Sequence, residues 1–217
     1  MTKKGERDDP DSPFRIDSDE SSHMQRICVF CGSRSGTNPI HADEAARLGT
    51  ILAQRGIGLV YGGGSIGLMG VVARAVISAR GSVVGVLPES LAAKEIVQRD
   101  VTELHIVETM HQRKALMADR SDSFLALPGG FGTCDELFEI LTWAQLGIHE
   151  KPVAILNTNG FFDPMLAFLD HMVGEGFLSV KNRSMLMVAT SINEVLEMVT
   201  SHRPTPIVEK WLDADER

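Results

Sequence analysis

Short runs of apolar residues alternate along this chain with stretches in which apolar residues recur every three or four positions. Several of the runs are almost continuously hydrophobic, as strands that helices cover on both faces must be. We predict strands at 26–31, 58–61, 82–87, 103–107, 123–127 and 152–156. The alternation with helical stretches is typical of βαβ units, so the strands should form a mostly parallel sheet.

The stretches between the strands have the spacing of amphipathic helices. Apolar positions recur in this way through 39–55, and Gly56 then supplies a C-terminal stop. The same spacing predicts helices around 137–144, at 163–175 and at 191–201. We therefore predict an α/β fold: a single Rossmann-like, doubly wound domain with helices on both faces of the sheet.

Length and composition narrow the class of protein. The 217 residues fit one large domain, at roughly 150 residues per domain. Hydrophobic residues make up 43% and charged residues 23%, which is typical of globular domains and excludes bulk disorder and membrane-spanning segments. The net charge of −8 argues against a nucleic-acid-wrapping surface. Three cysteines are too few for a disulfide scaffold, so we expect a cytoplasmic protein.

The two ends of the chain differ from its body. Residues 1–24 are strongly charged and have few large apolar side chains, so we predict a disordered extension without a signal peptide. Residues 25–201 form the predicted Rossmann-like nucleotide-binding domain, without an internal linker. Residues 202–217 form a tail whose role the sequence leaves open.

Three glycine-rich loops follow predicted strands: CGSRSG at 31–36, GGGSIGLMG at 62–70 and PGGFGT at 128–133. Each runs into a helical pattern, which would direct backbone N–H groups and the positive end of a helix dipole at a bound anion. None has the spacing of a dinucleotide or nucleoside triphosphate loop. Tight turns alone would explain one such loop, but three favour phosphate binding, with a nucleoside monophosphate as the simplest ligand.

Thr133 and Glu136 have the spacing of a capping box, in which Thr133 would cap the following helix and Glu136 would reach back. A carboxylate so close to a phosphate-binding loop would repel the phosphate unless something compensates its charge. Its presence there indicates work on a developing positive charge, such as a sugar oxocarbenium ion. The cap and the catalyst are compatible interpretations.

A second capping box, Thr109 to Gln112, is followed at once by Arg113 and Lys114. Two cations near a helix N-terminus oppose the helix dipole. They lie either on a solvated face or at a site where they meet an anion, and arginine suits bidentate contact.

Cys28 and Cys31 form a C-x-x-C pair that raises the possibility of a metal site. Residues three apart on a strand point to opposite faces, so joint chelation is disfavoured and packing is the better interpretation. We expect no metal site.

The segment MHQRKALMADRSDSFLALPGGFGTCDELFEILTWAQLGIHEKPV, together with CVFCGSRSG and GGGSIGLMG, resembles the LONELY GUY phosphoribohydrolases over about residues 25–200. Members of that family have often been labelled possible lysine decarboxylases. The resemblance implies cleavage of a cytokinin riboside 5′-monophosphate, or AMP, to the free base and ribose 5-phosphate. It also implies a cofactor-free enzyme that acts on a small nucleotide without nucleic-acid or membrane partners. The family usually forms dimers with the site near the subunit interface, so we expect a homodimer, with a larger homo-oligomer as the alternative.

The resemblance assigns roles to particular residues. Arg113 and Glu136 would be the catalytic pair. The implied substrate-binding residues are Glu95, Lys114, Gly129, Gly130, Gly132, Thr133 and Thr142. The sequence departs from many relatives at Cys134-Asp135, where they have Leu-Glu, and at Arg34, where they have a small residue.

Two alternatives to a phosphoribohydrolase remain open at this point. A nucleotide or phosphorylated-cofactor carrier would have the same fold and bind a ligand without cleaving it. A pyridoxal-phosphate decarboxylase would need a Schiff-base lysine, for which Lys114 is the only well-placed candidate.

Overall fold

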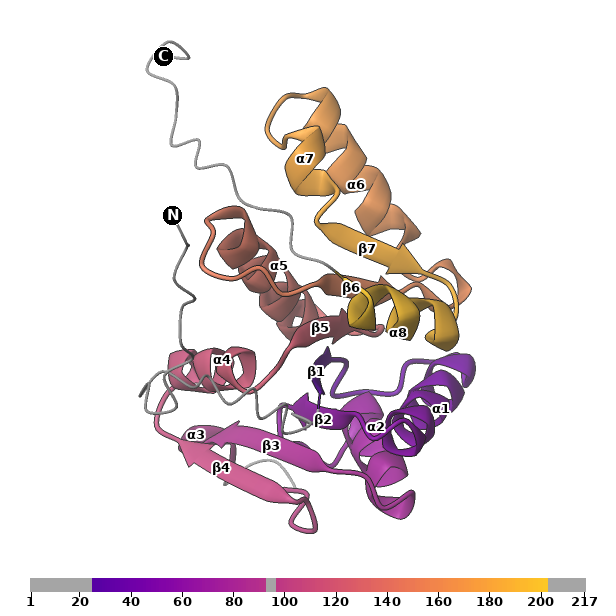
Figure 1. Cartoon of the computed structure of the whole chain (residues 1–217), viewed down its shortest axis with the longest axis vertical. Coiled ribbons are helices and arrows are strands. Elements are labelled where there is room, and N and C mark those ends of the chain that lie inside the picture. Colours follow the sequence, from indigo (N-terminus) through magenta and orange to yellow (C-terminus); the bar gives the residue numbers. More distant parts are fainter. Residues whose placement is uncertain (1–24, 93–96, 203–217) are drawn as a thin grey trace, which may run out of the picture.

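Seven parallel strands form one sheet in the computed structural model, which describes residues 25–92 and 97–202. They are β1 (Arg26–Phe30), β2 (Gly58–Tyr61), β3 (Val83–Pro88), β4 (Glu103–Val107), β5 (Ser123–Ala126), β6 (Val153–Leu156) and β7 (Leu186–Ala189). Their order across the sheet is β4-β3-β2-β1-β5-β6-β7 (Figure 1). Strands β2 to β4 thus lie to one side of β1 and strands β5 to β7 to the other. Ligands of open α/β sheets bind at the point where the strand order reverses in this way, here between β1 and β5.

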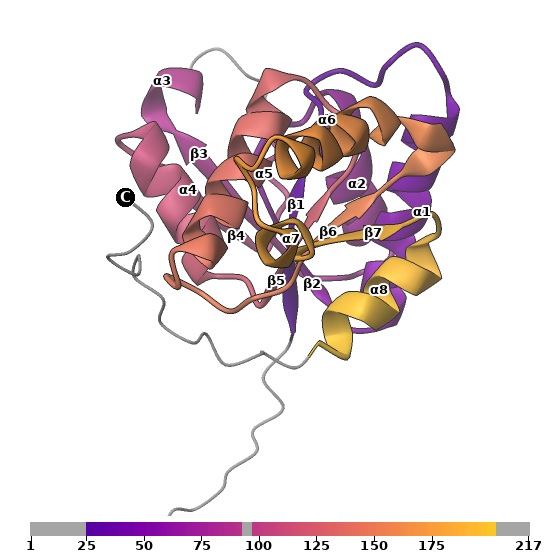
Figure 2. The ribbon, with the colours of Figure 1, turned by 90° about the horizontal axis from the view of Figure 1, so that it is seen from above.

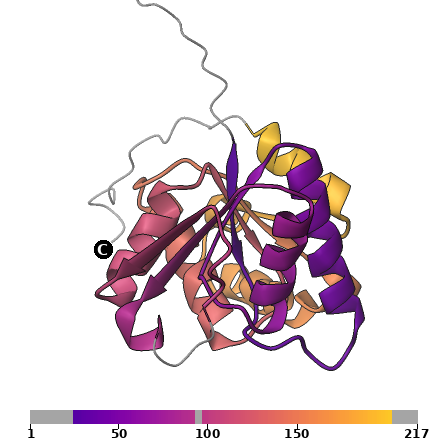
Figure 3. The same cartoon turned by 90° about the horizontal axis from the view of Figure 1, so that it is seen from below.

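Helices cover both faces of this sheet, as Figures 1 and 3 show. Residues of α1 (Ile40–Gln54), α2 (Gly67–Ser78) and α8 (Ile192–Thr200) pack in the core on one face. Residues of α4 (Met110–Asp119), α5 (Phe131–Gln145) and α6 (Asp163–Gly174) pack on the other. The remaining helical segments are short: α3 (Glu89–Ala92), the 3₁₀ turn η1 (Thr158–Gly160) and α7 (Val180–Arg183). The predicted doubly wound architecture is confirmed.

Alternation along β1 divides its side chains between two hydrophobic cores. Ile27 and Val29 belong, with Cys31 just after the strand, to the core under α1, α2 and α8. Cys28 and Phe30 belong to the core under α4, α5 and α6. The two cysteines are free and point to opposite faces, as the sequence spacing predicted. A shared metal ion is therefore excluded for this pair by geometry.

All six predicted strands occur, with each end within one residue of its predicted place. The seventh strand, β7, was missed because it is a four-residue segment that lies at the sheet edge and is only partly buried. The predictions for 1–24 and 203–217 lie outside the described residues. Within the described ranges, no helix combines the length and apolar character needed to cross a bilayer.

Candidate active site

The loops after β1, β2 and β5 meet at the switch point of the sheet. The Gly32 amide donates a hydrogen bond to the Pro128 carbonyl oxygen at 3.1 Å, and its Cα lies against Gly129. The Leu68 and Met69 amides at the start of α2 donate to the Gly32 carbonyl oxygen, at 3.0 and 3.4 Å. The three glycine-rich loops therefore contact one another.

The helices that follow these loops differ in what their first amides can bind. The start of α2 is capped by the backbone of the first loop, which corrects the expectation that every one of these helices offers free amides to an anion. In α5 no side chain caps the helix, and the amides of Phe131, Gly132 and Thr133 have no hydrogen-bond partner among the described residues. A Cβ built on Gly130 or Gly132 would meet nothing within 4 Å, so this helix start is open.

The predicted capping box at Thr133 and Glu136 is wrong. The N-cap of α5 is Gly130, in extended conformation, so Thr133 is already the third helical residue. Its side chain is buried against Gly129, where an added Cβ would lie 2.1 Å from the threonine oxygen. Glu136 is thus free of a capping role, and its carboxylate points to another helix.

The capping box at the start of α4 is confirmed. The Gln112 amide donates to the Thr109 hydroxyl oxygen at 3.1 Å, and the Gln112 side-chain oxygen accepts from the Thr109 amide at 3.2 Å. The cap fixes where α4 begins, and the next residue, Arg113, therefore lies at the end of its first turn.

Arg113 and Glu136 form an ion pair between α4 and α5, with Nη1 and Oε1 at 2.8 Å. Each side chain is only 11% exposed. The Arg113 Nε also donates to the Val86 carbonyl oxygen of β3, at 3.1 Å. The positive charge that compensates the Glu136 carboxylate is thus an arginine from the preceding helix, which a backbone carbonyl group of β3 also holds.

The environment of Glu136 shifts its protonation equilibrium. Burial raises the pKa of the carboxyl above its ordinary value, while the Arg113 guanidinium acts in the opposite direction. Displaced pKa values of buried carboxyl groups are typical of residues that exchange or stabilise charge in a reaction. The pair is therefore the chemically distinctive feature of this edge of the sheet.

Lys114, the second cation of α4, also pairs with α5. Its Nζ lies 2.9 Å from Asp135 Oδ2 and 3.1 Å from Glu139 Oε2. Burial lowers the pKa of Lys114, but the hydrogen bonds to the two carboxylates outweigh that effect and leave the pKa above its ordinary value. Both cations that oppose the dipole of α4 thus find their anions on α5, and Lys114 stays protonated.

Thr142 lies apart from the other residues that the resemblance assigned to the site. It is exposed, and its hydroxyl donates to the Phe138 carbonyl oxygen within α5 at 2.7 Å. Six residues separate it from Glu136, which is about 9 Å along a helix axis. Glu95 lies outside the described residues. The assignments of Thr142 and Glu95 to the substrate pocket remain predictions.

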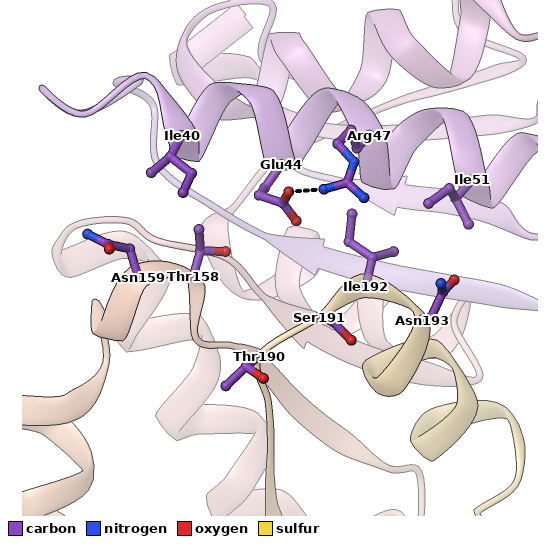
Figure 4. Close-up of a pocket in the computed structure, with 10 residues that line it drawn as sticks. All are labelled: Ile40, Glu44, Arg47, Ile51, Thr158, Asn159, Thr190, Ser191, Ile192 and Asn193. Atoms are coloured by element: carbon purple, nitrogen blue, oxygen red, sulfur yellow. Dashed lines mark hydrogen bonds and ion pairs between the residues drawn. The ribbon is translucent and has the colours of Figure 1, made fainter.

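A separate hollow of about 220 Å³ lies between α1 and the loops after β6 and β7 (Figure 4). Its lining includes the ion pair of Arg47 with Glu44, and Thr158, Thr190 and Ser191 from the loops. The residues predicted from the sequence to bind or cleave a substrate lie elsewhere, so this hollow is distinct from the Arg113–Glu136 site.

Solved structures share the fold at low sequence identity. A molybdenum cofactor binding protein from Rippkaea orientalis superposes with a TM-score of 0.64 at 23% identity, covering 83% of this chain and 98% of that one. The molybdenum cofactor carrier protein of Chlamydomonas reinhardtii superposes with a TM-score of 0.63 at 22% identity, covering 82% and 96% of the two chains. These likenesses establish the fold.

Sequence comparison is more specific. A family model described as "Possible lysine decarboxylase" matches residues 69–199. The cytokinin riboside 5′-monophosphate phosphoribohydrolase LOG1 of Arabidopsis thaliana is 49% identical over 183 residues, which are 84% of this chain and 86% of the relative. The phosphoribohydrolase LOG of Oryza sativa subsp. japonica is 49% identical over 183 residues, or 84% and 76% of the two chains. By these sequence matches, the chain belongs to the LONELY GUY family.

Proposed function

We propose that this protein hydrolyses the N-glycosidic bond of a nucleoside 5′-monophosphate, a cytokinin riboside 5′-monophosphate or AMP, to the free base and ribose 5-phosphate. The observation that carries the proposal is the uncapped start of α5 with a buried, arginine-paired glutamate, Glu136, on its second turn. The names of the relatives at 48–49% identity agree with this reaction.

The start of α5 would bind the 5′-phosphate. The free amides of Phe131, Gly132 and Thr133 and the positive end of the helix dipole suit an anion. The open space at Gly130 and Gly132 lets the phosphate approach the backbone closely. Binding energy gained at the phosphate, away from the bond that breaks, would hold the ribose beside the carboxylate.

Glu136 would act on the sugar. As a carboxylate it stabilises positive charge at the anomeric carbon when the bond to the base breaks, and it orients the attacking water. Arg113 favours the ionised form of Glu136 through the 2.8 Å contact, which partly offsets the effect of burial. The pair thus provides a carboxylate at a position where burial alone would favour the neutral acid.

The geometry around Lys114 argues against a lysine decarboxylase that works through a Schiff base. A Schiff-base lysine must lose its proton to attack a carbonyl group. The Lys114 ammonium is held by both Asp135 and Glu139, which favour its protonated form. We therefore assign Lys114 to the junction of α4 with α5, beside the substrate.

Purified protein incubated with AMP or isopentenyladenosine 5′-monophosphate, followed by chromatography, tests the proposal. We expect free base and ribose 5-phosphate from the monophosphates but not from the matching nucleosides. Glu136→Gln should lower kcat by about 100-fold or more with little change in nucleotide binding, whereas Thr133→Ala should weaken binding first. Glu197→Gln, an exposed position on α8, is the matched control. Nucleotides that bind and stay intact would instead support a carrier.

We also propose a homodimer that associates through the layer of α4 to α7. Figure 2 shows the helices α5, α6 and α7 of this layer from above. Seven large apolar side chains are exposed on or next to the helices of the layer: Met110, Phe131, Leu146, Ile148, Phe168, Phe177 and Val180. Five are exposed elsewhere among the described residues: Ile40, Ile66, Leu104, Ile106 and Phe161. Exposed apolar patches mark association sites. Thr142 is exposed beside Leu146, so in a dimer it could contact the substrate of the second copy.

The dimer is tested by measuring the molar mass of the protein with light scattering as it elutes from a size-exclusion column. We expect about twice the mass of one chain, a shift to one chain mass for Ile148→Asp and no shift for Ile40→Asp. A wild-type monomer would contradict the proposal.

We further propose a cytoplasmic location, which the three free cysteines support.

A further inference from the structure

Gly62, the first residue after β2, lies directly under the guanidinium of Arg113. A Cβ built on Gly62 would lie 1.9 Å from Arg113 Nη2 and 3.0 Å from its Cζ. Both distances are far below van der Waals contact. Any side chain at position 62 would thus occupy the space that the guanidinium fills.

This contact sets Gly62 apart from the other glycines of the site. Gly62 is not among the residues with positive φ, whereas its neighbour Gly63 has a φ of +78°. The three atoms nearest to a Cβ on Gly62 all belong to the end of the Arg113 side chain, whereas at Gly129 they include the buried Thr133 side chain and the Gly32 backbone. The local backbone therefore accepts a residue other than glycine at position 62, and the conflict is with Arg113 alone.

The guanidinium of Arg113 is held on its other sides by hydrogen bonds to three groups. Its Nη1 donates to Glu136 Oε1 at 2.8 Å and to Met110 Sδ at 3.4 Å, and its Nε donates to the Val86 carbonyl oxygen at 3.1 Å. A planar, rigid group that makes these bonds at once has one orientation, and Nη2 then lies over Gly62. A methyl group there would push the guanidinium away and break at least one of these bonds.

We infer that Gly62 is a positioning residue, whose bare Cα leaves room for Arg113 to hold the Glu136 carboxylate in its catalytic orientation. This inference rests on the proposed phosphoribohydrolase function. It predicts that Gly62→Ala folds but has the defect of an Arg113 variant, although position 62 carries no functional group. It also explains why position 62 is a glycine although, unlike Gly63, it has no positive φ that would require one.

The test is a double-mutant cycle of Gly62→Ala and Arg113→Ala, with Gly174→Ala as the matched control. Gly174 is exposed near the end of α6, and a Cβ there would meet nothing within 4 Å. Gly62→Ala should lower kcat by about 100-fold with little change in KM, because a group misplaced by an ångström costs about that much. In the Arg113→Ala background it should cause little further loss. The acid limb of the pH profile of kcat should move to higher pH in Gly62→Ala, as in Arg113→Ala.

A second readout does not depend on activity. If the methyl group and the guanidinium compete for the same space, the fall in melting temperature of the double variant should be smaller than the sum of the single falls. Multiplicative losses of kcat in the cycle, or full activity of Gly62→Ala, would overturn the inference. So would a double variant that fails to fold where Arg113→Ala folds. A wild-type protein that leaves both nucleotides intact would overturn the proposed function, and the melting cycle would still decide whether Gly62 makes room for Arg113.

Discussion

Replacing Arg113 by alanine should destabilise the protein in a pH-dependent way. The substitution removes the cation from a pair whose two side chains are each 11% exposed, and it removes the donor to the Val86 carbonyl oxygen. The Glu136 carboxylate would then be buried without a partner. Breaking a buried pair by removing one member costs about 3–5 kcal/mol. We expect a loss of that size near neutral pH.

The sign of the pH dependence follows from Glu136. Its pKa in the folded protein is already above the ordinary value of about 4.5, because of burial, and loss of Arg113 raises it further. Between the unfolded and folded pKa values the folded state binds more protons, so stability is lost as the pH rises. The slope approaches about 1.4 kcal/mol per pH unit for one proton. At pH 5 the acid can protonate, and the loss should be smaller than at pH 8.

Urea unfolding at pH 5 and pH 8 measures this effect. The free-energy difference between wild type and Arg113→Ala should be larger at pH 8. The double variant with Glu136→Gln should lose most of that pH dependence, because glutamine has no carboxyl group to titrate. Arg47→Ala is the control, because it breaks an ion pair in which Arg47 is 67% exposed and should cost less than about 1 kcal/mol. A loss from Arg113→Ala that is equal at the two pH values would refute the reasoning.

Three further outcomes follow from the same structure. The acid limb of the wild-type kcat profile should lie above pH 4.5, since burial raises the pKa of Glu136; a lower limb would contradict this. Thr109→Ala should lower the free energy of unfolding, measured with urea, by about 1 kcal/mol; an unchanged value would show that the cap does not stabilise the protein. Iodoacetamide and mass spectrometry should find Cys134 alkylated in the native state, whereas Cys28 and Cys31, buried with raised thiol pKa values, should react only after unfolding.

Most of the fold could be predicted because the strands of a parallel sheet are buried on both faces. The four residues of β2 and of β5 are all buried, so each appears in the sequence as a short, mostly apolar run between turn signals. The edge strand β7 lacks this signal, because two of its four residues are only partly buried. Its place in the sheet depends on pairing with β6, which a local pattern does not record.

The site was predictable where its chemistry is local. The glycine loops and the Thr109 capping box are contiguous motifs. The loops follow β1, β2 and β5 as predicted, and the capping box is confirmed. The Thr133 to Glu136 motif was misassigned because the same spacing arises whether the helix begins before or after Thr133. The extended Gly130 starts the helix three residues earlier. That shift places Thr133 inside the helix and turns Glu136 from a cap into a partner for Arg113.

The unfavourable charges at the start of α4 gave the one local hint of the Arg113–Glu136 contact. Cations there oppose the helix dipole, which indicated an anion but not its source. The source is 23 residues away on α5, and the contact also needs a carbonyl group of β3 and the bare Cα of Gly62. Stability gives little reason to bury such a pair, since well-packed apolar residues often serve as well or better. The proposed reaction, which needs a carboxylate beside a bound phosphate, does give such a reason, because the arginine would allow both anions to lie at the same edge of the sheet.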